Sequence, residues 1–256
     1  MKYTREYKIK LCDMGLDFRA KQKSILGYFQ ECFAEWCLVH KMTGYHLAQK
    51  GLMWVITNIN MENLGEMPFW SEDIRVEVWF SEVKKLRAYL EFRIFCGNRP
   101  VAQGDSCWMV LEQQTRRPVA IDKIVENCGI ENEKNFLLRK RLDNDAKGEL
   151  VNEVTFKATY SDLDYNGHVN NLSYLMWGVE SLPENFRNSH KVKNCSLVFH
   201  RECFLNDEIQ TQMYRDGDNF NFLIKRKNDD EIACMVEIET VESQQIPVNE
   251  LAALMS

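Results

Sequence analysis

Residues 160–171 are the part of this sequence whose side chains are best suited to chemistry. Six of these twelve residues are Asp, Asn or His, and a glycine lies in the middle. The stretch runs directly into an apolar segment with helical spacing, so it places polar side chains and backbone N–H groups at the N-terminus of a helix. Such a position favours negative charge, including charge that develops during a reaction. The candidate groups are therefore the Asp, Asn and His side chains of this loop and its backbone N–H groups.

Two apolar segments are predicted to form the helices that position these groups. One runs from about residue 171 to residue 182, stops at Pro183 and buries one face, formed by Leu172, Leu175, Met176 and Val179. The other spans residues 24–43, and its apolar residues nearly encircle it, as expected for a buried helix. These residues are Ile25, Leu26, Phe29, Phe33, Trp36, Cys37 and Val39.

Strands with alternating apolar residues follow each helix, at residues 74–80 and 88–94 and again at 220–224 and 232–238. A similar acidic turn precedes each set, Phe69-Trp70-Ser71-Glu72 in the first half and Phe204-Leu205-Asn206-Asp207 in the second. Each half therefore reads as a strand, a central helix and an antiparallel meander, because a sheet needs a cover for its apolar face. We predict an α+β chain with an N-terminal unit at 1–121, a polar linker at 122–148 and a C-terminal unit at 149–256.

Composition excludes several classes of protein. The formal net charge of −6 argues against a nucleic-acid binder. No apolar run approaches the roughly 20 residues of a membrane span, and the N-terminus lacks the apolar block of a secretory signal, so we expect a cytoplasmic protein. The nine cysteines form no CxxC pair, and neither a phosphate-binding glycine loop nor a G-x-S-x-G elbow is present. We expect no cofactor and no metal.

The pattern D-x-D-x-N-x-H-V-N-N at residues 162–171, followed by W-x-x-E-S at 177–181, resembles the acyl-acyl carrier protein thioesterases of plants and bacteria. The segment Arg201-Glu202-Cys203 resembles that family's R-R-E-C segment and lies at the same interval after the histidine. The resemblance is strong in the second half and only architectural in the first. It implies a tandem double hot-dog fold, in which each half is an antiparallel sheet wrapped around a central hydrophobic helix.

The resemblance also implies a catalytic site formed by Asp164, Asn166, His168 and Glu202. Thioester hydrolysis needs a nucleophilic water, a base and donors for the oxyanion. Glu202 is the expected general base. His168 and Asn166 would position the water or polarise the carbonyl, Asp164 would orient them or act on the water, and the backbone N–H groups of Gly167 and His168 would add to the oxyanion hole.

Cys203 is an alternative nucleophile, because a Cys-His-Asn set resembles a papain-type site. Neighbouring residues on a strand point to opposite sides, so we expect only one of Glu202 and Cys203 to face His168. A carboxylate is a ready base, whereas a buried thiol beside a glutamate resists ionisation. This comparison favours Glu202.

The first half lacks these residues, since its loop reads Asp17-Phe18-Arg19-Ala20-Lys21. One site per chain is expected, which leaves the helix at 24–43 and residues 53–56 to line an acyl tunnel. The predicted substrate is a fatty-acyl thioester of an acyl carrier protein, hydrolysed to free fatty acid. An acyl-CoA thioesterase, a non-catalytic acyl-binding protein and a hot-dog hydratase are the alternatives, and the oligomeric state, including a homodimer, stays open. Docking of an acidic carrier calls for a basic rim. The basic runs at 84–87, 116–117 and 139–141 are the only candidates for it, although each is expected to be solvated surface.

Overall fold

The computed structural model describes residues 2–126, 128–135 and 146–242. The chain divides into two compact units. One contains Met1–Asp13 and Ala20–Lys140, and the other contains Met14–Arg19 and Arg141–Ser256. The basic run at 139–141 and part of the expected linker lie outside the described residues.

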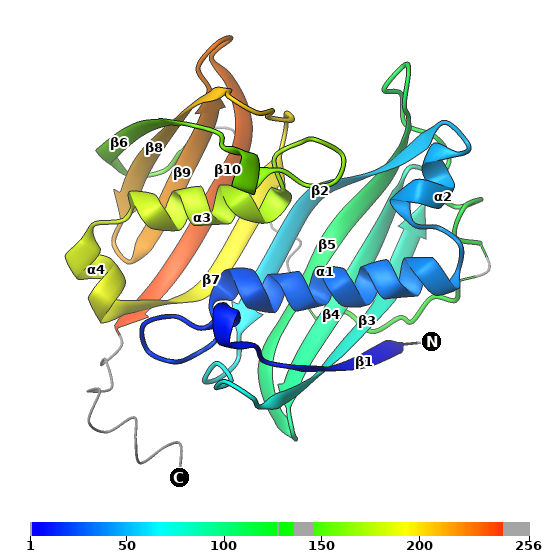
Figure 1. Cartoon of the computed structure of the whole chain (residues 1–256), viewed down its shortest axis with the longest axis horizontal. Helices are drawn as coiled ribbons and strands as arrows, with labels where there is room; N and C mark the ends of the chain where they lie inside the picture. Colours follow the sequence, from blue (N-terminus) through cyan, green and yellow to red (C-terminus); the bar gives the residue numbers. More distant parts are fainter. Residues whose placement is uncertain (1, 127, 136–145, 243–256) are drawn as a thin grey trace. The chain divides into compact units, whose positions relative to one another are not determined.

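The N-terminal unit contains five antiparallel strands, and a long helix, α1, lies against one face of them (Figure 1). Its strands lie in the order β1-β3-β4-β5-β2. Their bounds are β1 (Tyr3–Lys8), β2 (Leu52–Asn63), β3 (Asp73–Lys84), β4 (Arg87–Cys96) and β5 (Arg99–Glu112), and the helical segments are η1 (Leu11–Asp13), α1 (Gln22–Val39) and α2 (Gly44–Ala48).

The apolar alternation along β3 and β4 places one row of side chains from each strand in the core. All eight residues predicted for that face are at most 3% exposed: Ile74, Val76, Val78, Phe80, Ala88, Leu90, Phe92 and Ile94. The ring of Phe29 on α1 stacks on Phe92 with centroids 4.3 Å apart. The prediction of a helix-covered meander is confirmed in this unit.

The first helix is shorter than the sequence predicts. It ends at Val39, and Lys41 then adopts a left-handed φ of +55° that a helix does not continue through. Val39 is 61% exposed, so its assignment to the buried set is wrong. The other six residues of that set are buried.

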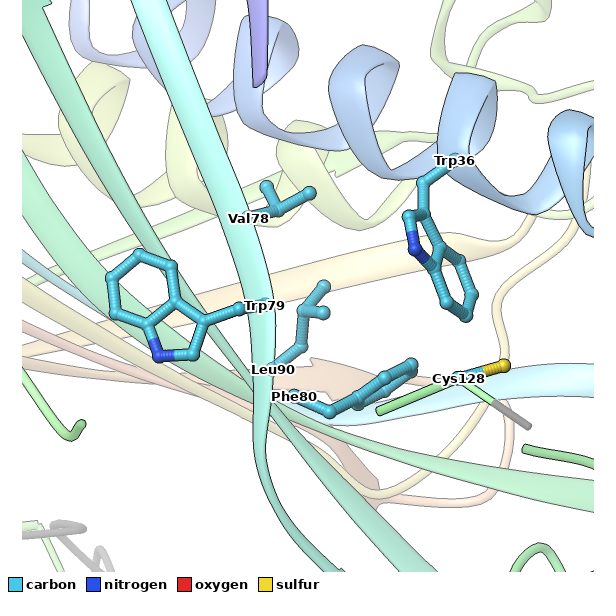
Figure 2. A pocket seen from close by; sticks show the side chains of 6 residues that line it. All are labelled: Trp36, Val78, Trp79, Phe80, Leu90 and Cys128. Atoms are coloured by element: carbon cyan, nitrogen blue, oxygen red, sulfur yellow. The ribbon is translucent and has the colours of Figure 1, made fainter. Parts of the chain in front are cut away.

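A small pocket in the N-terminal unit lies between α1 and the first strands of the meander (Figure 2). Trp36 reaches it from α1, and the ring of Phe80 lies 5.1 Å from the Trp36 ring. The lining residues are Trp36, Val78, Trp79, Phe80, Leu90 and Cys128. None of residues 53–56 of β2 is among them.

The C-terminal unit repeats the same design, with strands in the order β7-β10-β9-β8-β6 and the helix α3 over the sheet (Figure 1). Its elements are β6 (Glu149–Lys157), η2 (Tyr160–Asp162), α3 (Asn171–Ser181), α4 (Glu184–Ser189), β7 (His190–Phe199), β8 (Glu208–Asp216), β9 (Asn219–Arg226) and β10 (Glu231–Glu242). The helix lies where the sequence predicts it. Leu172 and Leu175 are buried, whereas Met176 and Val179 are only partly covered.

The last residue of the predicted N-terminal unit, Ile121, and part of the expected linker after it pack on the N-terminal sheet. Backbone N–H groups of Ile121 and Glu131 donate to the carbonyls of Lys85 and Phe80, each at 2.9 Å. The indole of Trp79 donates to the carbonyl of Glu133 at 2.8 Å. Residues 121–135, where described, therefore extend the N-terminal unit beyond its last strand.

Candidate active site

The polar loop before α3 is closed by its own hydrogen bonds. Thr159 and Asp162 form a capping box around η2, in which the Thr159 N–H donates to Asp162 Oδ2 at 2.8 Å. The N–H of Asn170 donates back to the carbonyl of Asp162 at 2.7 Å. The Asn170 side chain then caps α3, because its Oδ1 accepts from the N–H of Leu172 at 2.9 Å. The loop is thus fixed at both ends.

Asp164 organises the middle of this loop. Its Oδ1 accepts from the N–H of Asn166 at 2.8 Å and from the N–H of His168 at 3.3 Å, and its Oδ2 accepts from Asn166 Nδ2 at 3.4 Å. Gly167 takes a positive φ of +77°, which a glycine adopts without steric cost. Asp164, Asn166 and His168 are therefore brought together by one tight turn.

The two backbone groups expected to form the oxyanion hole are already occupied. The N–H of Gly167 donates to the carbonyl of Asp164 at 3.0 Å. The N–H of His168 donates to the carboxylate of the same residue. In this arrangement both N–H groups take part in the hydrogen bonds of the turn.

The structure brings His168 and Glu202 together. His168 Nδ1 lies 3.4 Å from Glu202 Oε1, and the two side chains are 21% and 37% exposed. The ring of Phe204 packs edge-on against the imidazole, with centroids 5.1 Å apart and planes at 89°. An imidazole and a carboxylate therefore meet at a partly open surface, with an aromatic ring on one side.

Glu202 and Cys203 do not lie on a strand, although the sequence analysis treated them as neighbours on one. The strand β7 ends at Phe199, and Glu202 lies in the connection between β7 and β8. The N–H groups of His200 and Arg201 both donate to the carbonyl of Ala233 on β10, at 2.9 and 3.1 Å. This shared acceptor ends the regular pairing and turns the chain toward the loop at 168.

Cys203 points into the core although it is not on a strand. Its side chain is fully buried, while its carbonyl accepts from the N–H of Val169 at 2.8 Å. Burial raises the pKa of the Cys203 thiol to about 11. The thiol therefore stays protonated near neutral pH, which makes it a poor nucleophile.

The repeated turns predicted from the sequence have matching geometry. The N–H of Phe69 donates to the Glu72 carboxylate at 2.7 Å, and the N–H of Phe204 donates to the Asp207 carboxylate at 2.9 Å. The third residue of each turn, Ser71 or Asn206, has a φ of +68°. Counting back from these turns, the residue at the position of Glu202 is Met67.

The loop before α1 has the same hydrogen-bond frame as the loop before α3. The N–H of Gly15 donates to the carbonyl of Arg19 at 2.8 Å, as the N–H of Asp164 does to that of His168. Arg19 therefore holds the position of His168. By the same alignment, Gly15 holds the position of Asp164 and Asp17 holds that of Asn166. The N-terminal loop keeps the backbone of the site without its chemical groups.

Phe204 is a site residue that sequence reasoning missed. It was recognised only as part of a repeated turn, and its contact with His168 depends on the bridge between the two loops. Within the described residues, no group of three or more His, Cys, Asp or Glu side chains is arranged to hold a metal ion. The helices in the described part of the chain are all too short or too polar to cross a membrane.

Two family models match this chain. The model of the acyl-ACP thioesterase N-terminal domain matches residues 1–128, and that of the acyl-ACP thioesterase C-terminal domain matches residues 145–242. The chain is also 25% identical over 229 residues to a chloroplastic palmitoyl-acyl carrier protein thioesterase of Gossypium hirsutum. That match covers 82% of this chain and 54% of the relative, so the chain spans about half the length of the curated relatives it matches.

Solved structures share the fold. An acyl-ACP thioesterase from Bacteroides thetaiotaomicron superimposes with a TM-score of 0.83 at 19% identity, covering 94% of this chain and 98% of that one. A 12:0-ACP thioesterase from Umbellularia californica gives a TM-score of 0.82 at 18% identity, with the same coverage of both chains. These matches confirm the predicted tandem hot-dog fold.

Proposed function

Because this chain belongs to the acyl-ACP thioesterase family, we propose that it hydrolyses fatty-acyl thioesters of acyl carrier protein to free fatty acid and carrier thiol. The observation that carries this proposal is the 3.4 Å approach of His168 Nδ1 to Glu202 Oε1. These two groups come from different segments and meet beside the loop that precedes α3. A base and a hydrogen-bonding imidazole at one partly exposed point suit the attack of water on a thioester.

In the proposed reaction, Glu202 takes a proton from a water molecule while the water oxygen attacks the carbonyl carbon. The tetrahedral intermediate then expels the thiolate, the C–S bond breaks, and the proton passes to the departing sulfur. We assign the proton transfer to the Glu202 carboxylate, whose Oε1 lies beside the imidazole of His168. We assign the thiol of Cys203 a structural role in the core and no role in catalysis, because it is buried and its pKa is raised.

Oxyanion stabilisation is assigned to side chains, since the N–H groups of Gly167 and His168 bond Asp164. Asn166 is exposed, and its amide nitrogen makes only a long 3.4 Å contact with Asp164. We assign that amide and the His168 ring to the water or the developing oxyanion. Loss of one such donor typically costs roughly 100- to 1000-fold in rate.

The division of the chain follows from the same proposal. Residues 1–121 bind the acyl chain, together with the segment up to residue 135 that packs on the same unit. The rest of 122–148 connects the units, and 149–256 carry the catalytic groups. The acyl carrier protein is the proposed partner, and CoA is the rival carrier.

The test is the release of free fatty acid from acyl carrier protein thioesters of graded chain length, with the matching acyl-CoA thioesters in parallel. Glu202→Gln keeps the shape of the side chain and removes the base, so we expect kcat to fall roughly 100- to 10,000-fold. Cys203→Ala is the matched neighbour and should keep most of the activity. No hydrolysis of any carrier thioester by the natural chain contradicts the proposed function, and a fully active Glu202→Gln protein contradicts the assigned base.

A further inference from the structure

The connection that carries Glu202 is anchored along its backbone. Arg201 bonds the carbonyl of Ala233 on one side of Glu202, and Cys203 bonds the N–H of Val169 on the other. The carbonyl of Glu202 itself accepts a hydrogen bond of 3.1 Å from Nη1 of Arg226. This contact holds the residue from the strand β9.

Arg226 is itself held in place by Asp229 of the β9–β10 hairpin. Its Nε donates to Asp229 Oδ1 at 3.1 Å, and its Nη2 donates to Asp229 Oδ2. Asp229 Oδ1 also accepts from the N–H of Glu231, at 3.3 Å. The guanidinium therefore uses one edge for the hairpin and its remaining nitrogen for Glu202, a geometry that a single ammonium group does not reproduce.

The duplication of the fold provides a built-in comparison. Arg226 pairs with Ile209 across β8 and β9, and the matching pair across β3 and β4 is Cys96 with Ile74. The half with Glu202 therefore has an arginine at this register position. The half with Met67 in place of Glu202 has a cysteine there.

We propose that Arg226, fixed by Asp229, is a positioning residue that holds the backbone of Glu202 so that its carboxylate stays against His168. The inference rests on the proposed function, because it gives Arg226 a role only through the assigned base. A base displaced by about 1 Å loses on the order of 100-fold in rate, so the anchor acts on the chemical step rather than on substrate affinity.

The test compares Arg226→Ala, Arg226→Lys and Asp229→Asn, with Lys225→Ala as the matched control. Lys225 also pairs with an aspartate of the same hairpin, Asp230, at 3.4 Å. We expect kcat for acyl carrier protein thioesters to fall roughly 10- to 100-fold in Arg226→Ala with KM unchanged. Arg226→Lys and Asp229→Asn should fall between Arg226→Ala and the natural protein, and Lys225→Ala should match the natural protein.

A double-mutant cycle with Glu202→Gln separates positioning from a general structural role. If Arg226 acts through Glu202, Arg226→Ala has no further effect on the residual rate of Glu202→Gln. Equal losses in both backgrounds, an effect on KM alone, or a natural kcat in both Arg226 variants overturns the inference. The proposed function fails separately, when the natural chain shows no hydrolysis or Glu202→Gln stays fully active.

Discussion

At the scale of single residues, Asp164 differs from the other site residues because both of its carboxylate oxygens are engaged within its own loop. It accepts hydrogen bonds from the backbone of Asn166 and His168 and from the Asn166 amide. Bonds to a charged acceptor are worth about 1.5–3 kcal/mol each. We therefore assign Asp164 to shaping the turn and not to a proton transfer.

Asp164→Asn and Asp164→Ala separate these two roles. The asparagine keeps an acceptor oxygen for the two backbone N–H groups, so we expect it to retain most of the activity. The alanine removes both acceptors, and the shift of His168 should lower kcat roughly 100-fold. The measurement is kcat together with the thermal midpoint of each variant. An asparagine variant as inactive as the alanine one would mean that the negative charge itself takes part in the reaction.

At the scale of elements, the two central helices begin from equivalent loops but have different caps. Asn170 caps α3 through its side chain, with φ −59° and ψ 135°. Lys21 occupies the same position before α1, with φ −68° and ψ 152°, and makes no side-chain cap. The backbone at both positions is suited to an N-cap, so the difference lies in the side chain alone.

Exchanging the caps should change stability in opposite directions. Asn170→Ala should lower the free energy of unfolding by about 1 kcal/mol, and Lys21→Asn should raise it by a similar amount. Urea unfolding followed by circular dichroism measures both changes. A destabilising Lys21→Asn would show that the two loops do not share a cap geometry.

At the scale of the whole molecule, most cysteines are buried and none of the nine forms a disulfide. Burial raises the pKa of Cys32 and Cys195 to about 12 and that of Cys203 to about 11. In the unfolded chain a thiol titrates near 8.5. As pH rises, these thiols therefore lose their protons first in the unfolded state. The stabilisation that is present below the unfolded pKa is lost as pH rises toward the pKa of each thiol in the folded protein.

We therefore expect alkaline conditions to destabilise the protein. Each such thiol lowers the free energy of unfolding by about 1.4 kcal/mol per pH unit between its unfolded and its folded pKa. Urea unfolding at about pH 7.5 and about pH 10 measures the loss, and Cys195→Ala should show a smaller one. Equal stability of the natural chain at both pH values would contradict this expectation.

If the N-terminal unit binds the acyl chain as proposed, bulky core side chains such as Trp36 beside the small pocket should limit the length of that chain (Figure 2). Trp36→Phe enlarges the pocket, so we expect faster release of longer acyl groups. Trp177→Phe on α3 is the control, because Trp177 is as buried as Trp36, at 7% and 6% exposed. Release rates over carrier thioesters of graded length measure the change, and an unchanged optimum in Trp36→Phe contradicts this role of Trp36.

Local pattern was enough to predict the two helices, the meanders and the polar loop at 160–171, because apolar periodicity and helix capping are properties of neighbouring residues. The resemblance also placed Glu202 and His168 in one site. Both predictions depend on residue types and on their spacing, which can be read directly from the sequence.

Tertiary structure decided the rest, because those features depend on contacts between distant segments. The N–H groups of His200 and Arg201 share the carbonyl of Ala233, so the regular strand pairing ends before Glu202. Asp164 accepts hydrogen bonds from the two backbone N–H groups that were expected to stabilise the oxyanion. The contact of Arg226 with Glu202 joins residues 24 positions apart and depends on the register of β9. No local pattern in the sequence encodes such a register, because it follows from how the whole sheet pairs.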